Sequence, residues 1–210
     1  MAINLNNKDN ASLLHDKTNG MGSGTYYLAD NTKYFEPQRS NNFVFYVDSL
    51  FNTENPASSL VPQNNYAGSN SEEVIRVSCS KAFVPSFTQG VIQVKRGNNT
   101  MKFAGVPEFS NGSIVLNDYI GAGTKDLLVA WQQMSYDVHT EKVGLADDYK
   151  RRAYLLEYTP DNQLVRSWVL LGCWISGLDF GEFNHESNDK MTVTATIEYD
   201  KGYIDLSGTP

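Results

Sequence analysis

The segment Met191–Asp200 has the sequence MTVTATIEYD, in which apolar and polar side chains alternate. Val193, Ala195 and Ile197 fall on one side of an extended chain, and the threonines between them fall on the other. This alternation predicts a β-strand with one apolar face and one polar, threonine-rich face.

One amphipathic helix is predicted before this strand, over Lys125–Val138. Its apolar residues recur at steps of three and four, which places them on one side of a 3.6-residue turn: Leu127, Leu128, Trp131, Met134 and Val138. Thr124 is the expected N-cap. We expect this apolar side, with Trp131 at its centre, to pack on the sheet or across a subunit boundary.

Further strand-like segments surround the helix. The predicted strands are Asn42–Val47, Val74–Ser80, Val91–Arg96, Met101–Val106, Ser113–Leu116, Arg152–Tyr158 and Leu164–Ile175. The turn residues Gly97–Asn99 and Thr159–Asn162 predict two hairpins. Many strands and one helix predict a mainly β fold, with two packed antiparallel sheets that form a β-sandwich or barrel and one flanking helix at about 125–138.

The chain of 210 residues is predicted to form a polar N-terminal arm, residues 1–40, and a single β-sandwich domain, residues 41–205. The arm is rich in Asn, Asp, Gly, Ser and Thr, so we expect it to be extended or mobile until it docks. Its aromatic residues predict docking on its own subunit or a neighbour: Tyr26, Tyr27, Tyr34 and Phe35. A long polar loop is predicted at about 51–71. We expect the arm or this loop to become ordered when subunits stack.

The net charge of −7 is concentrated in the last third of the chain. Residues 1–140 carry 12 acidic and 10 basic side chains, whereas residues 141–210 carry 12 acidic and 7 basic ones. An acidic protein of this kind is a poor match for a nucleic-acid-binding surface that depends on phosphate neutralisation.

No catalytic, cofactor-binding or metal-binding residues are assigned from the sequence. His15, His139 and His185 each lack a second His or Cys at ligand spacing. Residues 121–125 lack the Gly-Lys-Ser/Thr order of a phosphate-binding loop. Four carboxylates at Asp179, Glu182, Glu186 and Asp189 are compatible with glycoside hydrolysis or calcium binding, but a solvated acidic loop fits their spacing better. We therefore do not expect an enzyme or a cofactor.

Cys79 and Cys173 both lie in apolar, strand-like runs, which predicts two buried, reduced thiols. A disulfide between neighbouring strands is the alternative. The N-terminal residues lack the pattern of a signal peptide, and the longest apolar run, Trp168–Ile175, is too short to cross a bilayer. These features predict a protein made in a cytoplasm, without membrane insertion.

The segment Arg39–Phe45, RSNNFVF, resembles the segment that opens the core domain of bacteriophage tail tube proteins. The polar arm, the helix Lys125–Val138, the hairpin Arg152–Ile175 and the threonine-rich last strand also follow in the order of that family. Over roughly residues 35–205 the chain is similar to the tail tube and type VI secretion tube superfamily.

The resemblance implies a structural virion protein whose six-membered rings stack into a hollow tail tube, through which DNA is ejected. It implies contacts with further copies of the chain and with tail sheath, baseplate or initiator, and terminator proteins. DNA would pass through the lumen without specific binding. The implied location is the virion tail, assembled in the host cytoplasm. The alternatives are a tube subunit of a contractile injection system or secretion machine, and a carbohydrate-binding β-sandwich module with an aromatic platform in a groove.

The acidic charge adds an expectation about the wall of such a tube. A lumen that repels phosphate lets DNA slide without being gripped. The polar face of Met191–Tyr199, followed by Asp200, is the candidate lining. Open sheet edges favour strand addition between subunits, which would join their sheets.

Overall fold

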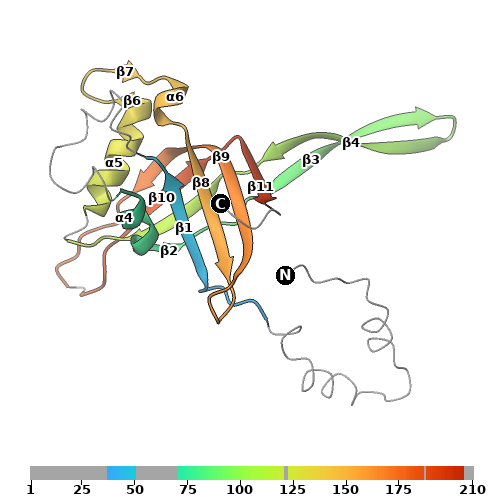
Figure 1. Cartoon of the computed structure of the whole chain (residues 1–210). Helices are drawn as coiled ribbons and strands as arrows, with labels where there is room; N and C mark the ends of the chain where they lie inside the picture. Colours follow the sequence, from blue (N-terminus) through green and yellow to red (C-terminus); the bar gives the residue numbers. More distant parts are fainter. Residues whose placement is uncertain (1–36, 51–70, 121–122, 187, 206–210) are drawn as a thin grey trace, which may run out of the picture. The chain divides into compact units, whose positions relative to one another are not determined.

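A long strand, β9 (Leu164–Asp179), runs through a seven-stranded antiparallel sheet (Figure 1). The order across the sheet is β1–β8–β9–β10–β5–β2, and β11 also pairs with β9. The other strands span Phe43–Asp48 (β1), Cys79–Lys81 (β2), Gly112–Asn117 (β5), Arg151–Tyr158 (β8), Thr192–Glu198 (β10) and Lys201–Asp205 (β11). The computed structural model describes residues 37–50, 71–120, 123–186 and 188–205, and all of these elements lie in the unit Asn41–Pro210.

The sheet bends at Gly172, in the middle of β9. β10 and β11 follow one another along one edge of β9, with Lys201 opposite Leu171. Gly172 has a φ of 70°, in the left-handed region that glycine adopts at no steric cost. The N–H of Asp200 donates to the carbonyl of Leu171 at 2.9 Å. An irregularity of this kind increases the local twist, and the sheet curls into a half-barrel (Figure 1).

An ion pair spans β9 at this bend. The Lys150 ammonium, just before β8, lies 2.8 Å from both carboxylate oxygens of Asp200. Hydrogen bonding to Asp200 raises the pKa of Lys150 above its usual value. A Cβ at Gly172 would overlap the Asp200 carboxylate. The bend therefore needs a residue without a side chain.

The core lies between the sheet and the helix α5 (Thr124–Ser135). Alternate strand residues point into it, and the helix adds Leu127, Leu128, Ala130, Trp131 and Met134. Each large apolar side chain that is fully buried stabilises the fold by about 1.5–3 kcal/mol. The Trp131 indole N–H also donates to the Tyr149 carbonyl at 3.0 Å, which ties α5 to the short helix α6 (Ala146–Tyr149). Trp131 is a core residue, as predicted.

The predicted helix is confirmed, but its two ends differ from the prediction. It ends at Ser135, because Tyr136 is extended and begins β6 (Tyr136–Asp137), which pairs with β7 (Lys142–Val143). Val138 is therefore not part of the buried stripe, and its side chain is 71% exposed. Thr124 is not the N-cap. Gly123 holds that position, and the buried Thr124 hydroxyl hydrogen-bonds to Ser78 at 3.2 Å.

The predicted strand Val74–Ser80 is wrong. Ser71–Ser78 forms the helix α4, and the short strand β2 follows it. The buried residues Ser71, Ile75 and Ser78 are four and three apart, which is helical spacing, while Val77 faces solvent. The sequence does not show this pattern clearly, because two of its three buried residues are serines and serine is not apolar. The described residues thus contain three helices, α4, α5 and α6, where one was expected.

The mainly β class is confirmed, whereas the arrangement as two packed sheets is not. β9 continues through the bend, so the core strands form one curled sheet. Within this sheet, five predicted strands are found with shifted ends, as β1, β5, β8, β9 and β10, and β11 was not predicted. The predicted arm, residues 1–40, and the loop at 51–71 fall almost entirely outside the described residues, so both stay predictions.

Candidate assembly surfaces

A hairpin of two long strands, β3 (Phe87–Arg96) and β4 (Asn99–Phe109), extends away from the curled sheet (Figure 1). The strands pair with each other from Phe87 opposite Phe109 to Arg96 opposite Asn99. Gly97 makes the turn with a φ of 60°. The sequence predicted this hairpin with shorter strands, and placed it among the core strands.

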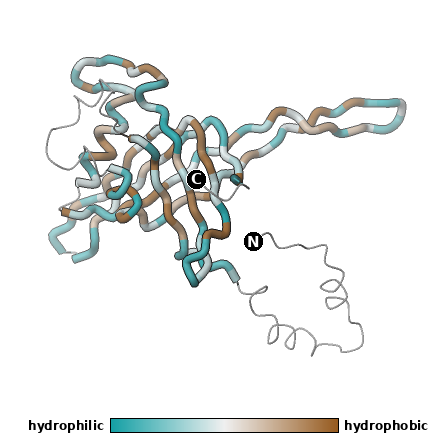
Figure 2. The backbone as a smooth tube through the Cα atoms, viewed as in Figure 1, coloured by the Kyte–Doolittle hydropathy of each residue, from teal (hydrophilic) through white to brown (hydrophobic). Residues whose placement is uncertain are grey.

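Both faces of the hairpin are exposed. The adjacent residues Val91 and Ile92 point to opposite faces, yet their side chains are 60% and 54% exposed. Apolar residues continue along the hairpin (Figure 2), including Val94, Met101, Phe103 and Val106. An exposed apolar surface of this extent is typical of a binding surface, because it gains free energy when a partner removes it from water.

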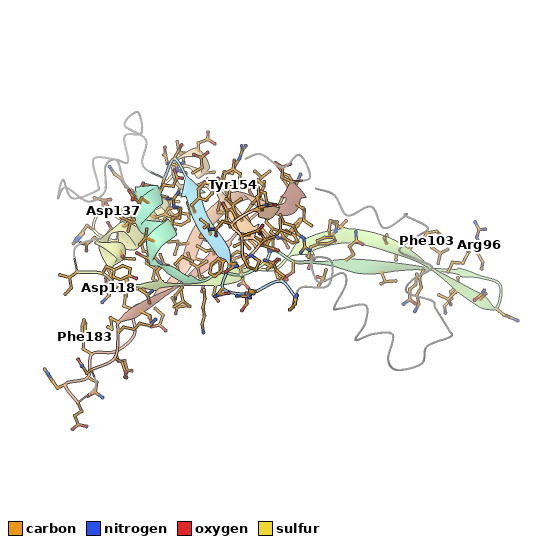
Figure 3. The ribbon with its side chains drawn as sticks, turned by 60° about the horizontal axis from the view of Figure 1, so that its bottom comes forward. Arg96, Phe103, Asp118, Asp137, Tyr154 and Phe183 are labelled. Atoms are coloured by element: carbon orange, nitrogen blue, oxygen red, sulfur yellow. The ribbon has the colours of Figure 1, made fainter. Side chains whose placement is uncertain are left out.

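The hairpin also differs from the rest of the chain in charge. It carries Lys95, Arg96 and Lys102 against the single acid Glu108, a net charge of +2 in a chain of −7. The three basic residues lie near the turn, and Arg96 lies at the far end of the hairpin (Figure 3). The tip therefore favours an acidic partner.

Aromatic rings fasten the root of the hairpin to the end of β10. The Tyr199 ring stacks on Phe83 at 5.6 Å between centroids and meets Phe109 edge-on at 5.9 Å. Phe109 in turn packs on Phe87 at 5.6 Å. A Cβ at Gly112 would overlap the Phe83 ring, so the close approach requires glycine.

The Tyr199 hydroxyl adds two hydrogen bonds at the root of the hairpin. Tyr199 donates its hydroxyl proton to the Ser86 carbonyl at 3.1 Å and accepts the Ser86 N–H at 3.0 Å. A phenol can do both at once. Burial raises the pKa of Tyr199. Tyr199 continues the alternation of Val193, Ala195 and Ile197, which indicates an apolar strand position but not an anchor. The signal for the anchor was the set of phenylalanines that flank the hairpin, Phe83, Phe87 and Phe109.

A second surface is the polar face of β10. Val193, Ala195 and Ile197 are buried, and the alternate residues Thr192, Thr194, Thr196 and Glu198 are only half-buried on the opposite face. The predicted two-faced strand is confirmed. Glu198 accepts a hydrogen bond from the Asn111 amide at 3.2 Å, and Ser113 and Asn117 of β5 continue this face.

The four candidate carboxylates are exposed and do not form a metal-binding group. Asp179 accepts the N–H of Gly181 at 3.0 Å, and exposed residues surround it in the loop, including Glu182, Glu186 and Asp189. His139 and His185 are exposed, and His15 lies outside the described residues. Within residues 37–50, 71–120, 123–186 and 188–205, no group of three or more His, Cys, Asp or Glu side chains could hold a metal ion.

Both cysteines are free thiols, but only one of them is fully buried, where two were predicted. Cys173 is buried and Cys79 is half-buried, and burial raises the pKa of each thiol to about 12. The Cys79 thiol donates to the Lys81 carbonyl at 3.3 Å.

A pair of tyrosines bears on the carbohydrate-binding alternative. The Tyr46 and Tyr154 rings stack on each other, with centroids 5.0 Å apart and planes 19° apart. Each ring therefore covers one face of the other, which leaves less ring surface for a sugar.

Among the described residues, no helix is long and apolar enough to cross a membrane.

Comparison with known proteins gives similarity at the level of structure alone. Neither a protein-family model nor a curated protein matches the chain. A chain of the sheath–tube complex of the PVC extracellular contractile injection system, in the extended state, superposes with a TM-score of 0.56 at 14% identity, over 86% of this chain and 97% of that chain. The curled sheet of this chain therefore has the same fold as a chain found in that sheath–tube complex.

Two further chains, both from assemblies that terminate a tube, have the same fold. A chain of the anti-feeding prophage cap, which terminates the tube, matches with a TM-score of 0.55 at 14% identity, over 80% of this chain and 91% of that chain. A chain of the PVC sheath/tube terminator matches with a TM-score of 0.55 at 14% identity, over 81% and 97%. The predicted resemblance to the tail tube superfamily is confirmed for the fold.

Proposed function

We propose that the chain is a structural subunit of a hollow tube in a tail or injection particle, and not an enzyme. The observation that carries this proposal is the tube fold, which extends over 80–86% of the chain and 91–97% of the neighbouring chains. The projecting hairpin adds physical support, because its apolar faces and anchored root suit a contact with another subunit.

Subunits of this tube form rings of six that stack. A contact between two different surfaces of the same chain closes into a ring when the rotation returns to its start, and stacks into a tube when it also repeats along an axis. In the described chain β1, β2 and β11 each pair with a single neighbour in the seven-stranded sheet, so strand addition at these edges would join neighbouring sheets. The expected partners are sheath, baseplate or initiator, and terminator proteins.

The polar face of β10 lines the lumen in this proposal. Its threonines offer a wet, uncharged surface, and Glu198 adds negative charge. An acidic wall repels the phosphates of DNA, so DNA in a phage tail tube would slide along it. Screening over roughly 8–10 Å restricts the effect to side chains near the lumen. A tube that delivers another cargo from a contractile injection system is the alternative, which the structural neighbours favour. The assembled protein resides in the particle, after assembly in the host cytoplasm.

Electron microscopy of the purified full-length protein tests the assignment. We expect rings with sixfold symmetry, and tubes at high concentration or beside an initiator protein. A protein that stays monomeric under all of these conditions would rule out the tube role. A map of the tube would also test the lining: a basic or neutral lumen rejects the acidic wall and leaves the tube assignment intact.

A deletion tests the arm. A variant without residues 1–35 should fold and form rings but stack poorly, because the arm carries aromatic anchors in an otherwise polar segment. Stacking equal to that of the full chain would show that the arm has no such role.

A further inference from the structure

An apolar patch lies at the end of the Asn41–Pro210 unit opposite the hairpin tip. It combines the segment after β5 with the segment after β9, and its exposed side chains are Tyr119, Ile120, Phe180 and Phe183. Phe183 is 89% exposed and Ile120 is fully exposed. Figure 3 shows Phe183 and Asp118 at one end and Arg96 and Phe103 at the other. We call these four side chains the end patch.

The end patch is preformed by contacts within the subunit. Lys125, in the first turn of α5, pairs with Asp118 at 3.1 Å. Its ammonium also lies 4.9 Å from the centre of the Phe183 ring, which is a favourable cation–π distance. The N–H of Asp118 donates to the Met191 carbonyl at 3.0 Å, which holds the two segments together.

The segment around Phe183 carries the charge opposite to that of the hairpin. Residues 179–190 contain four acids and one base, Lys190, a net charge of −3. The hairpin has a net charge of +2. Both surfaces also expose large apolar side chains. The two surfaces are therefore opposite in net charge and alike in hydrophobic character, which makes them complementary.

We propose that the hairpin tip of one copy docks on the end patch of a second copy of this chain. Lys95, Arg96 and Lys102 would face Glu182 and Glu186, while Phe103 and its neighbours cover the patch. Because the two surfaces differ and lie at opposite ends, the contact is head-to-tail and leaves a free hairpin and a free patch for the next copy. This inference rests on the proposed tube function and names the receptor of the hairpin.

A second exposed apolar patch provides a matched control. It consists of Tyr136, Val138, Val143 and Leu145, near Glu141 and Asp147. Residues 141–149 have a net charge of −2, which is less acidic than residues 179–190. The end patch is favoured because it has more acidic charge and because Lys125 holds its most exposed ring in place.

Charge reversal of the full-length protein tests the contact. The hairpin variant carries Lys95→Glu, Arg96→Glu and Lys102→Glu, and the patch variant carries Glu182→Lys and Glu186→Lys. All five side chains are exposed, so both variants should keep the wild-type melting temperature. We expect each variant alone to self-associate at least about tenfold more weakly in sedimentation velocity, with the deficit smaller at high salt.

An equimolar mixture of the two variants should restore association. The acidic hairpin of one variant then meets the basic patch of the other, and the unmodified hairpin and patch also match. Glu141→Lys with Asp147→Lys should leave association unchanged.

Other results overturn the inference. If wild-type protein assembles and neither reversal weakens it, or the mixture is no better than the variants alone, the receptor lies elsewhere and the tube function stands. If the control weakens association and the patch variant does not, the second patch is the receptor. A wild-type protein that remains monomeric at every concentration rejects both the docking contact and the tube function.

Discussion

The strand β9 and the hairpin β3–β4 are both long antiparallel elements, yet they use their apolar residues in opposite ways. In β9, Leu170, Cys173 and Ile175 point into the core and are almost completely buried. In the hairpin, every residue of β3 is exposed. Both elements pair in the antiparallel manner, β9 along both of its edges and each hairpin strand along only one in the described chain, so the type of pairing does not distinguish them. The difference lies in the burial of apolar side chains, which is the dominant favourable term in folding.

This comparison separates two roles within one subunit. The curled sheet and α5 hold the fold, because they bury the core. The apolar side chains of the hairpin are not buried in the subunit's own core, so they remain available to a partner. Mutations in the first region should change folding stability, and mutations in the second should change association.

Trp131→Ala should have the largest effect on stability. The side chain is 1% exposed and its indole N–H donates to Tyr149, so we expect a loss of about 3–5 kcal/mol in the free energy of unfolding. Denaturant unfolding of the monomer measures it. Val138→Ala is the control and should cost less than about 0.5 kcal/mol, because Val138 lies beyond the helix and faces solvent. Equal losses would show that the helix continues through Val138.

Gly172→Ala should have the next largest effect. Alanine would have to adopt a φ near 70° and displace the Asp200 carboxylate from Lys150, so we expect a loss of about 1–3 kcal/mol. The control is Gly177→Ala in the same strand, where a Cβ meets only Thr196, at an ordinary contact distance. If both variants unfold at the same denaturant concentration, the bend does not depend on Gly172.

Tyr199→Phe should have a smaller effect, at the boundary between the two regions. The change keeps the ring stack on Phe83 and Phe109 but leaves the Ser86 N–H without the hydroxyl, which should cost about 1–2 kcal/mol. Denaturant unfolding measures the loss, and limited proteolysis compares access to the hairpin root. A variant as stable and as resistant to protease as the wild type would show that the rings alone fix the root.

Phe103→Ser should have the smallest effect on stability and a clear effect on association. Its ring is half exposed and has Ile92 opposite, so the monomer should lose less than about 1 kcal/mol. Ring or tube formation, followed by light scattering, should weaken. A loss of stability as large as that of Trp131→Ala, with association intact, would reverse the roles of the two regions.

The sequence predicted those elements whose pattern reflects burial within the subunit. Leu127, Trp131 and Met134 defined α5, and Val193, Ala195 and Ile197 defined β10, because their spacing equals the period of the element. The helix α4 was missed because Ser71 and Ser78 are buried through packing and, for Ser78, a hydrogen bond to Thr124. Their hydroxyls carry no hydrophobic signal.

The candidate surfaces were less predictable than the core, for a different reason. An apolar run such as that of β3 predicts a strand, but it looks the same whether the core or another subunit covers it. The bend at Gly172 likewise depends on the contact between residues far apart in the chain, Lys150 and Asp200. The contacts of Tyr199 with Phe83, Phe109 and Ser86 likewise form only after the strands have paired. The local sequence pattern contains no information about such contacts.

The two-stranded nature of the hairpin has a consequence for hydrogen exchange. In the described chain β3 pairs with β4 and with no third strand, so alternate amides along its outer edges face water. These amides should exchange rapidly in the free subunit, while those of β9 exchange only through rarer, larger openings. A partner that adds a strand would slow exchange along a whole hairpin edge, whereas docking through side chains at the tip would leave much of that edge fast. The exchange rates of individual amides in β3 and β4 would therefore distinguish strand addition from docking through side chains.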